Sequence, residues 1–279
     1  MIKNSRLGTA ALTAAAALVG ISVFLPLWWV FASSLRPGNT YVNYTTPLSW
    51  LAFIPIGGNF TNYDHLLSGP FMEGLANSFL VAVATIVVGL AIAIPAAYAL
   101  ATIDFWGKKL VFTFVILVAM VPFDAIAIPL SGLFQQWGLS DSYAGLVLPA
   151  LANGFAIFVL RQFYLGIPPE LLDAAEVDGL GRFRTLWYVF LPLSLPAMIG
   201  AGMMLFLSQW AAYLWPLLIG TSPEKQVAPI ALANLSTMFS VNLGQILAGS
   251  FILSIIPMIL LLFFQRHYTE SLSTTGLKG

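Results

Sequence analysis

The sequence predicts an all-α polytopic membrane protein with six transmembrane helices. Of its 279 residues, 59% are hydrophobic and 8% are charged, compared with about 45–50% and about 25% in a soluble globular domain. Apolar segments of about 20 residues, long enough to cross the hydrocarbon core of a bilayer, recur along the whole chain. One such segment is compatible with a buried core helix, but six exceed what a core of this size holds.

Each predicted span is a long apolar segment that ends at polar or turn-forming residues. The first follows Lys3 and Arg6 and imitates a signal peptide, but its length and the aromatic pair Trp28 and Trp29 favour an uncleaved anchor. Prolines lie inside or near the ends of most spans, where each removes a backbone donor and tends to kink its helix. The six predicted spans are 10–33, 75–101, 110–133, 144–164, 193–219 and 244–265.

Lysine and arginine residues predict the orientation, because basic loops resist translocation. With six spans and a cytosolic N-terminus, nine of the 11 basic residues lie inside, and only Arg36 and Lys225 lie outside. This distribution predicts that both termini are cytosolic. The loops 34–74, 134–143 and 220–243 are then expected to face outward.

Several classes of function lack the residues they need. The two histidines, His65 and His267, fall on opposite sides of the predicted membrane, and the chain has no cysteine, so no metal site is expected. Gly107 and Lys108 lack the first glycine and the final Ser or Thr of a nucleotide-binding loop. A net charge of zero and the absence of a basic stripe exclude a nucleic-acid partner. The sequence therefore predicts a protein that is not an enzyme, with no catalytic residue and no cofactor of its own.

The cytosolic loop of about 165–192 is polar and predicts a surface that contacts a partner in the water phase. Glu170 and Asp173 place negative charge at the positive N-terminus of a short predicted helix, and Gly179 is expected to end it. An apolar stripe at helical spacing consists of Leu171, Leu172, Ala174 and Ala175. The stripe fits a groove on a partner protein, and it fits equally well a helix that folds back on its own bundle.

Residues 173–192 resemble the signature of ABC importer permeases. That signature reads Glu-Ala-Ala, three residues, Gly, nine residues, Ile-x-Leu-Pro, and this chain keeps all the spacings, with Asp for Glu and Val for Ile. The matching residues are Asp173, Ala174, Ala175, Gly179, Val189, Leu191 and Pro192. Further segments, around Trp210 and at 222–225 and 276–279, resemble the second permease subunit of maltose-type carbohydrate importers.

The resemblance implies a type I ABC importer permease fold, with residues 1–279 as one transmembrane domain in the bacterial cytoplasmic (inner) membrane. It implies a homologous second permease, an extracytoplasmic binding protein reached by the loop 220–243, and two ATPase subunits that carry ATP and Mg. The tail 266–279 is expected to be ordered between those ATPase subunits. The residues expected to couple to them are Glu170, Asp173, Ala174, Ala175, Gly179, Leu191 and Pro192.

Candidate pathway residues are polar or aromatic side chains within the apolar spans. Asp124 is a lone carboxylate near the outer end of the third span, and Asn153 lies in the fourth. Gln209 and Tyr213 are four residues apart and share a helical face. Hydrogen bonding between helices explains Gln209 and Tyr213 at least as well as a pathway does. For Asp124 the alternative is a position at interfacial depth, where a charge costs little, and Asn153 has a similar standing. Trp210 and Trp215 are available for stacking.

The substrate predicted by resemblance is a di- or oligosaccharide, with glycerophosphodiesters and polyols as alternatives. Where the family carries Trp-Asn in the fifth span, this chain has Trp210 and Ala211, which by resemblance implies a less polar pathway. A secondary transporter without ATPase partners is a more distant alternative. Such transporters are expected to show internal repeats and more charge inside the membrane, and this sequence has neither.

Overall fold

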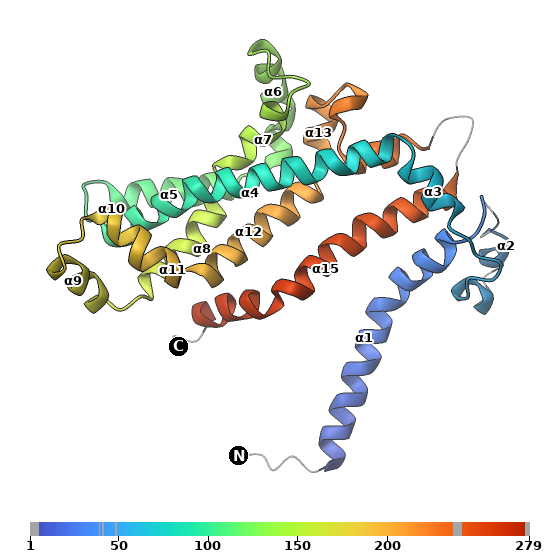
Figure 1. The fold of residues 1–279 in the computed structure, drawn as a ribbon, viewed down its shortest axis with the longest axis horizontal. Coiled ribbons are helices and arrows are strands. Elements are labelled where there is room, and N and C mark those ends of the chain that lie inside the picture. The colour runs from blue at the N-terminus through green and yellow to red at the C-terminus, as the bar shows by residue number, and fades with distance from the viewer. Residues whose placement is uncertain (1–5, 39, 41, 48, 237–241, 277–279) are drawn as a thin grey trace. The chain divides into compact units, whose positions relative to one another are not determined.

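All regular elements of the described residues are helices, with no β-strand among them, so the all-α prediction is confirmed. Figure 1 shows their course. Two compact units make up the chain, one of Met1–Met72 and Ala231–Ile256 and the other of Glu73–Ile230 and Pro257–Gly279. The computed structural model describes the backbone of residues 6–38, 40, 42–47, 49–236 and 242–276.

The first unit contains a long apolar helix and a folded cap. Its elements up to Met72 are α1 (Arg6–Ser34), α2 (Val42–Thr45), the 3-10 helix η1 (Trp50–Phe53) and α3 (Thr61–Leu67), followed by the start of α4. The cap is held by Arg36, a buried guanidinium that donates hydrogen bonds to the carbonyl oxygens of Leu51 and Ile54 and lies 4.1 Å from the ring centre of Tyr44. The predicted outer loop 34–74 is therefore folded rather than extended.

The second unit carries the second to fifth predicted spans and the loop 165–192. Its elements are α4 (Pro70–Thr102), α5 (Lys108–Ala119), α6 (Phe123–Gln136), α7 (Tyr143–Leu151), α8 (Gly154–Leu165), α9 (Glu170–Val177), α10 (Arg182–Thr185), the π-helix η2 (Leu186–Phe190), α11 (Leu191–Leu193), α12 (Leu195–Trp210), α13 (Leu214–Ile219) and the 3-10 helix η3 (Pro223–Lys225). Two further helices, α14 (Ala228–Ala233) and α15 (Leu243–Gly276), contain residues of both units.

Three helices are long and apolar enough to cross a membrane in one piece, and they match the first, second and sixth predicted spans. They are Gly8–Ser34, Pro70–Thr102 and Leu243–Gln265. Three helix pairs also qualify, but each is bent at a short break: 92° between α5 and α6, 43° between α7 and α8, and 80° between Arg182–Leu193 and Leu195–Trp210. The described residues therefore contain three to six spans.

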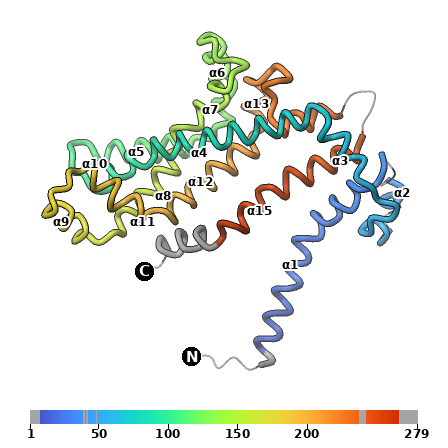
Figure 2. The backbone as a smooth tube through the Cα atoms, in the orientation of Figure 1, coloured from blue at the N-terminus to red at the C-terminus, as the bar shows by residue number. Residues whose placement is uncertain are grey.

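The predicted spans 110–133, 144–164 and 193–219 are each interrupted, at 120–122 between α5 and α6, at 152–153 between α7 and α8, and at 211–213 between α12 and α13. Backbone geometry at proline explains two of the breaks, because proline donates no hydrogen bond and its ring clashes with the carbonyl four residues earlier. Pro122 adopts an extended conformation immediately before α6, and Pro216 takes away the hydrogen bond that the Ala212 carbonyl would accept. At the break between α7 and α8, Asn153 is the N-cap residue of α8, and its side chain accepts a hydrogen bond from the Ala156 N–H. Figure 2 shows the chain turning between α5 and α6.

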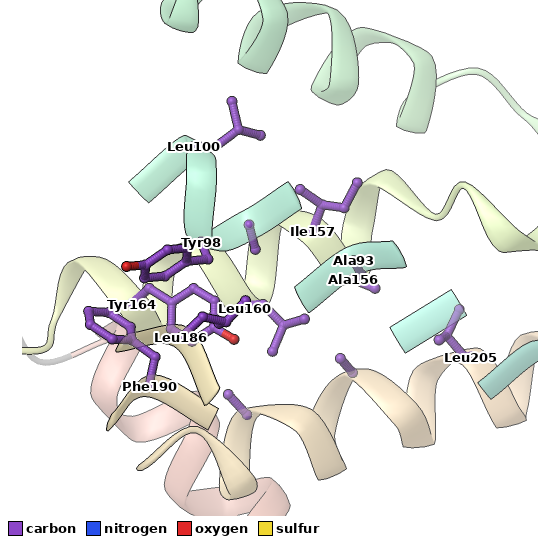
Figure 3. Close-up of a cluster of buried hydrophobic side chains, with 13 residues drawn as sticks. Ala93, Tyr98, Leu100, Ala156, Ile157, Leu160, Tyr164, Leu186, Phe190 and Leu205 are labelled. Carbon is purple, nitrogen blue, oxygen red and sulfur yellow. The ribbon is translucent and has the colours of Figure 1, made fainter. Parts of the chain in front are cut away.

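Two clusters of buried side chains hold the second unit together. The larger one joins α4, α8, η2 and α12, with Tyr98, Tyr164 and Phe190 in edge-to-face contact at one end (Figure 3). The smaller one joins α4, α6, α7 and α13 around Phe134 and Trp215. The helices that border the breaks are thus fixed by packing on both sides.

Candidate functional site

A cavity of about 760 Å³ lies in the second unit beside three helix breaks: the one between α5 and α6, the one between α7 and α8, and the one between α12 and α13. Its lining includes Val121 from the α5–α6 break, Ala152 from the α7–α8 break, and Ala211 and Ala212 from the α12–α13 break. Backbone groups outside a helix are tolerated at membrane depth only where protein buries them or where they line a water-filled space. Three helix breaks therefore border one space, whose lining side chains are mostly apolar and include the polar residues Asp124, Asn153 and Gln209.

Four of the five predicted pathway residues line this cavity: Asp124, Asn153, Gln209 and Tyr213. Asn153 accepts a hydrogen bond from the backbone N–H of Ala156 at 3.0 Å and caps α8. The side-chain amide of Gln209 donates to the carbonyl oxygen of Leu146 at 3.3 Å. Gln209 thus joins α12 to α7, as the alternative of helix–helix hydrogen bonding predicts, whereas Asn153 caps its own helix.

Asp124 and Tyr213 differ from them because their polar groups remain available. Asp124 lies in the first turn of α6, where the helix dipole favours a negative charge. Within the described part of the chain it has no hydrogen bond or ion pair. The Tyr213 side chain is 46% exposed. These two groups can contact a solute in the cavity.

Trp210, the fifth predicted pathway residue, does not line the cavity. Its ring is buried and stacks on Phe206 at a centroid distance of 5.3 Å, with Phe79 edge-on at 5.1 Å. Trp215 lines the cavity instead. Its indole N–H donates to the Gly145 carbonyl oxygen at 3.0 Å. This carbonyl has no partner within α7, because the residue four positions later is Pro149, which has no N–H.

Three other aspects of the lining were not predicted from the sequence. Phe123 and Phe155 face the cavity as apolar walls. Gly154 allows α8 to approach α5, because a Cβ atom there would lie 2.7 Å from the Val115 carbonyl oxygen and 2.9 Å from the Ala119 Cβ. Their apolar or minimal side chains carried no signal that distinguished them from ordinary residues of a membrane helix.

The helix predicted in the polar loop is α9, which is coloured yellow at one end of the second unit in Figure 1. Its apolar stripe is divided between two environments. Ala175 is buried and Leu172 packs against the larger core cluster, so part of the helix folds back on the bundle. Leu171 and Ala174 are exposed, as are the carboxylates of Glu170, Asp173, Glu176 and Asp178.

Gly179 ends α9 as predicted. It has a φ angle of +74°, a conformation that side chains with a Cβ atom disfavour. Its N–H donates to the Glu176 carbonyl oxygen at 3.0 Å, and the next N–H, of Leu180, donates to the Ala175 carbonyl oxygen at 2.9 Å. Farther along the signature, Leu191 is half-buried and Pro192 is exposed, both in α11.

Two predicted contact segments are only partly described. The outer loop 220–243 includes residues 237–241, and the tail 266–279 ends with 277–279, all of which lie outside the described residues. The side chains of 266–276 also lie outside them, although the backbone of α15 continues to Gly276. The predicted order of the tail in an assembled transporter stays a prediction.

The family described as "Binding-protein-dependent transport system inner membrane component" matches residues 87–272, which contain both the cavity and α9. The chain belongs to this family. Its relatives in this comparison cover nearly the whole length of this inner membrane component. It is 31% identical to the arabinooligosaccharides transport system permease protein AraQ of Halalkalibacterium halodurans, over 99% of both chains.

Two other relatives of this inner membrane component carry different solutes by name. It is 31% identical to the trehalose transport system permease protein SugB of Mycobacterium tuberculosis, over 91% of this chain and 92% of that one. It is 30% identical to the sn-glycerol-3-phosphate transport system permease protein UgpE of Yersinia pestis, with the same coverage. Both are permease proteins, which confirms the resemblance inferred from residues 173–192.

The fold is also that of a solved transporter subunit. A chain from the crystal structure of a bacterial ABC transporter involved in the import of the acidic polysaccharide alginate superimposes with a TM-score of 0.78, at 22% identity, over 96% of this chain and 98% of that one. The same transporter type in complex with an alginate pentasaccharide-bound periplasmic protein gives a TM-score of 0.61 at 16% identity. The permease fold predicted from the sequence is therefore present.

Proposed function

We propose that this inner membrane component is the permease subunit of an ATP-driven importer of an oligosaccharide, and that the cavity is its half of the translocation pathway. The observation that supports this proposal is that three helix breaks border one cavity. Broken helices expose backbone polar groups that a hydroxyl-rich solute can use in place of water. The names of two relatives, for arabinooligosaccharides and trehalose, agree with a sugar substrate.

The charge of the lining favours an uncharged sugar over a phosphorylated or acidic one. Asp124 is the only charged residue among the lining residues, and no lysine or arginine accompanies it. A carboxylate accepts hydrogen bonds from sugar hydroxyls but repels a phosphate or a uronate. Phe123 and Phe155 provide flat apolar walls for the carbon faces of a sugar ring. The glycerophosphodiester alternative is therefore the weaker one for this half of the pathway.

The partners of this proposal follow from the family and from the surface of α9. A homologous second permease completes the pathway, and an extracytoplasmic binding protein delivers the sugar. Two ATPase subunits, which bind ATP and Mg, dock on α9 through the exposed signature residues around Asp173. The carboxylates of α9 are exposed, and Leu172 and Ala175 fix its inner side to the bundle. Such a helix is suited to transmit force between the ATPase subunits and the bundle.

A single-cysteine experiment tests the pathway, because the chain has no cysteine of its own. In the assembled transporter, Ala212→Cys on the cavity wall should react with a charged, membrane-impermeant thiol reagent, and the transported sugar should slow that reaction. The control is Val87→Cys on α4, which is 61% exposed in the single chain and is not a lining residue. It should stay unreactive in lipid.

Two outcomes would contradict the proposal. An unreactive Ala212→Cys in a transporter that still imports sugar would show that the cavity is not part of the translocation pathway. Purification of an active importer without ATPase subunits would instead favour the secondary transporter. Uptake assays with a neutral oligosaccharide and with glycerol-3-phosphate then distinguish the two substrate classes, and uptake of glycerol-3-phosphate alone would contradict the charge argument.

A further inference from the structure

We propose that the segment Arg182–Leu193 is an interfacial anchor that binds anionic phospholipid headgroups of the leaflet on the α9 side. The observations that carry this proposal are the direction of the segment, the separation of its buried and exposed residues, and the composition of its exposed side. The proposal depends on the chain being a membrane component, and it is independent of both the cavity and the ATPase contacts.

The direction of the segment places it near the plane of the bilayer. Arg182–Leu193 is bent by 80° from Leu195–Trp210, the apolar helix that follows it. Membrane-spanning helices tilt by about 20° on average from the bilayer normal. If Leu195–Trp210 crosses the bilayer at that tilt, Arg182–Leu193 lies within about 30° of the membrane plane. Such an orientation is typical of a helix that lies in the headgroup region rather than one that crosses the hydrocarbon core.

One side of the segment is fixed to the bundle. Leu186 and Phe190 are buried in the larger core cluster (Figure 3). Phe190 makes edge-to-face contacts with Tyr98 of α4 and Tyr164 of α8 at centroid distances of 5.0 and 5.4 Å. The segment is therefore a rigid part of the bundle, and its exposed side chains are held in place.

The other side of the segment exposes aromatic rings beside arginines. Phe183, Trp187 and Tyr188 are 71%, 52% and 73% exposed, and the Phe183 and Trp187 rings lie 6.1 Å apart. Arg182 and Arg184 are exposed as well, and within the described part of the chain neither forms an ion pair.

This composition fits the headgroup region better than it fits water or a protein groove. Trp187 and Tyr188 each combine an apolar ring with a polar group, which is why such residues concentrate where a membrane meets water. A guanidinium matches the phosphodiester of a lipid with two parallel hydrogen bonds. The nearby helix α9 exposes carboxylates, such as Glu170 and Glu176, and no arginine or lysine, so the two exposed surfaces are suited to different surroundings.

Depth measurements in the whole transporter test the proposal. Tyr188→Cys is labelled with a nitroxide in proteoliposomes, and its accessibility to oxygen and to a water-soluble nickel complex is compared with that of Glu176→Cys on α9. The ratio of oxygen to nickel accessibility should be higher for the Tyr188 label than for the Glu176 label, because oxygen concentrates in lipid and the nickel complex in water. An equal or lower ratio at Tyr188, or a Tyr188 label that neither reagent reaches, would place water or another protein subunit there and would overturn the proposal.

A lipid titration tests the charged part independently. ATP-driven sugar uptake is measured in vesicles of phosphatidylcholine with and without phosphatidylglycerol, for the wild type and for the double variant Arg182→Gln, Arg184→Gln. Anionic lipid should raise wild-type uptake several-fold, and the double variant should lose most of that dependence. An equal dependence in both proteins would contradict headgroup binding, and so would a wild type that shows none.

Discussion

The loop that contains α9 and the predicted outer loop 220–243, whose residues 220–228 form the outer segment, were both predicted to contact partners, but the structure fixes them to the bundle very differently. α9 touches its own bundle through Leu172 and Ala175, and its carboxylates are exposed. The outer segment is bound to α4 and to the start of α7 by a network of hydrogen bonds. Two loops that were both predicted to contact a partner therefore differ in how much of their polar surface is left exposed.

Asn77 of α4 is the centre of the outer network. Its side-chain amide donates to the carbonyl oxygens of Glu224 and Gln226 at 2.9 and 2.8 Å, and it accepts from the Tyr143 hydroxyl at 2.8 Å. The Lys225 ammonium lies 4.0 Å from the centre of the Tyr143 ring.

Two more side chains complete the attachment. Ser78 accepts from the Ala228 N–H at 2.9 Å, and Asp141 accepts from the Ser222 N–H at 2.8 Å. α9 thus leaves its carboxylates exposed, as the proposed contact with an ATPase subunit requires, whereas hydrogen bonds fix residues 220–228 to α4 and to the start of α7. Variants that disturb α9 should therefore affect coupling, and variants that disturb the outer network should affect stability.

The largest effect is expected at the end of α9. Gly179→Leu forces a residue with a Cβ atom into a left-handed conformation, which costs about 1–2 kcal/mol. The turn after α9 should relax and displace the helix, and substrate-stimulated ATPase activity should fall about tenfold, as expected for about 1.4 kcal/mol. The measurement is ATPase activity with and without the loaded binding protein, at equal membrane expression.

Gly181 provides the matched control two residues later. It has ordinary backbone angles, and a Cβ atom there would meet nothing within 4 Å, so Gly181→Ala should behave as the wild type. If the loaded binding protein stimulates the ATPase activity of both variants normally, α9 has no role in coupling. If both lose stimulation equally, the geometry at Gly179 is not the cause.

A medium effect, on stability rather than coupling, is expected at Asn77. Asn77→Leu leaves two carbonyl oxygens without their donor, at about 1–3 kcal/mol for each buried group. The apparent melting temperature of the purified transporter should fall by about 5 °C, as expected from a loss of roughly 2 kcal/mol in a chain of this size. Tyr143→Phe removes one hydrogen bond and keeps the ring under Lys225, so it should lower the temperature less.

The contrary result is also informative. An Asn77→Leu variant with unchanged thermal stability, but with uptake abolished and basal ATPase activity intact, would show that residues 220–228 act on the binding protein. The distinction between a fixed segment and a contact surface would then fail for the outer segment.

The smallest effect is expected from protonation of Asp141, which lies outside the spans. The Ser222 N–H holds the pKa of this carboxyl below its ordinary value. A lowered folded-state pKa adds stability above the ordinary value of about 3.9, and that stability is lost as pH falls through the folded pKa. Hydrogen exchange of residues 220–228, corrected for its intrinsic rate, should therefore be slow at neutral pH and should speed up only below about pH 4.

Asp141→Asn serves as the control for that titration. Asn tolerates the φ angle of +56° at this position and keeps an oxygen acceptor for Ser222. Its exchange should show no added change below about pH 4. Identical pH profiles of hydrogen exchange in the two proteins would show that the Asp141 charge does not stabilise residues 220–228.

The sequence predicted features that depend on local chemistry and missed those that depend on packing. The limits of α9 follow from its N-cap residue Pro169 and from Gly179 with its positive φ angle, because both act within one turn of the helix. The helix breaks do not follow from proline alone, because Pro26, Pro95 and Pro257 lie inside the unbroken helices α1, α4 and α15. Whether a proline breaks a membrane helix depends on which distant groups bond the freed carbonyls.

The same division holds for the cavity. Asp124, Asn153, Gln209 and Tyr213 were recognisable as polar side chains in apolar segments, and the structure brings all four to one space. The choice between two nearby tryptophans was not recognisable. Trp215 donates to a carbonyl on α7 and lines the cavity, whereas Trp210 is enclosed by aromatic rings. Only the break between α12 and α13 separates their roles.

A cross-linking measurement tests most directly whether α9, and not the outer segment, is the surface for the ATPase subunits. Val177→Cys on α9 and Glu224→Cys in the outer segment are both exposed positions of a chain without native cysteine. With a short photoactivatable label in the assembled, active transporter, Val177→Cys should yield an adduct with an ATPase subunit, and Glu224→Cys should yield none. Absence of an ATPase adduct at Val177 in a transporter that still hydrolyses ATP and imports sugar would contradict this account.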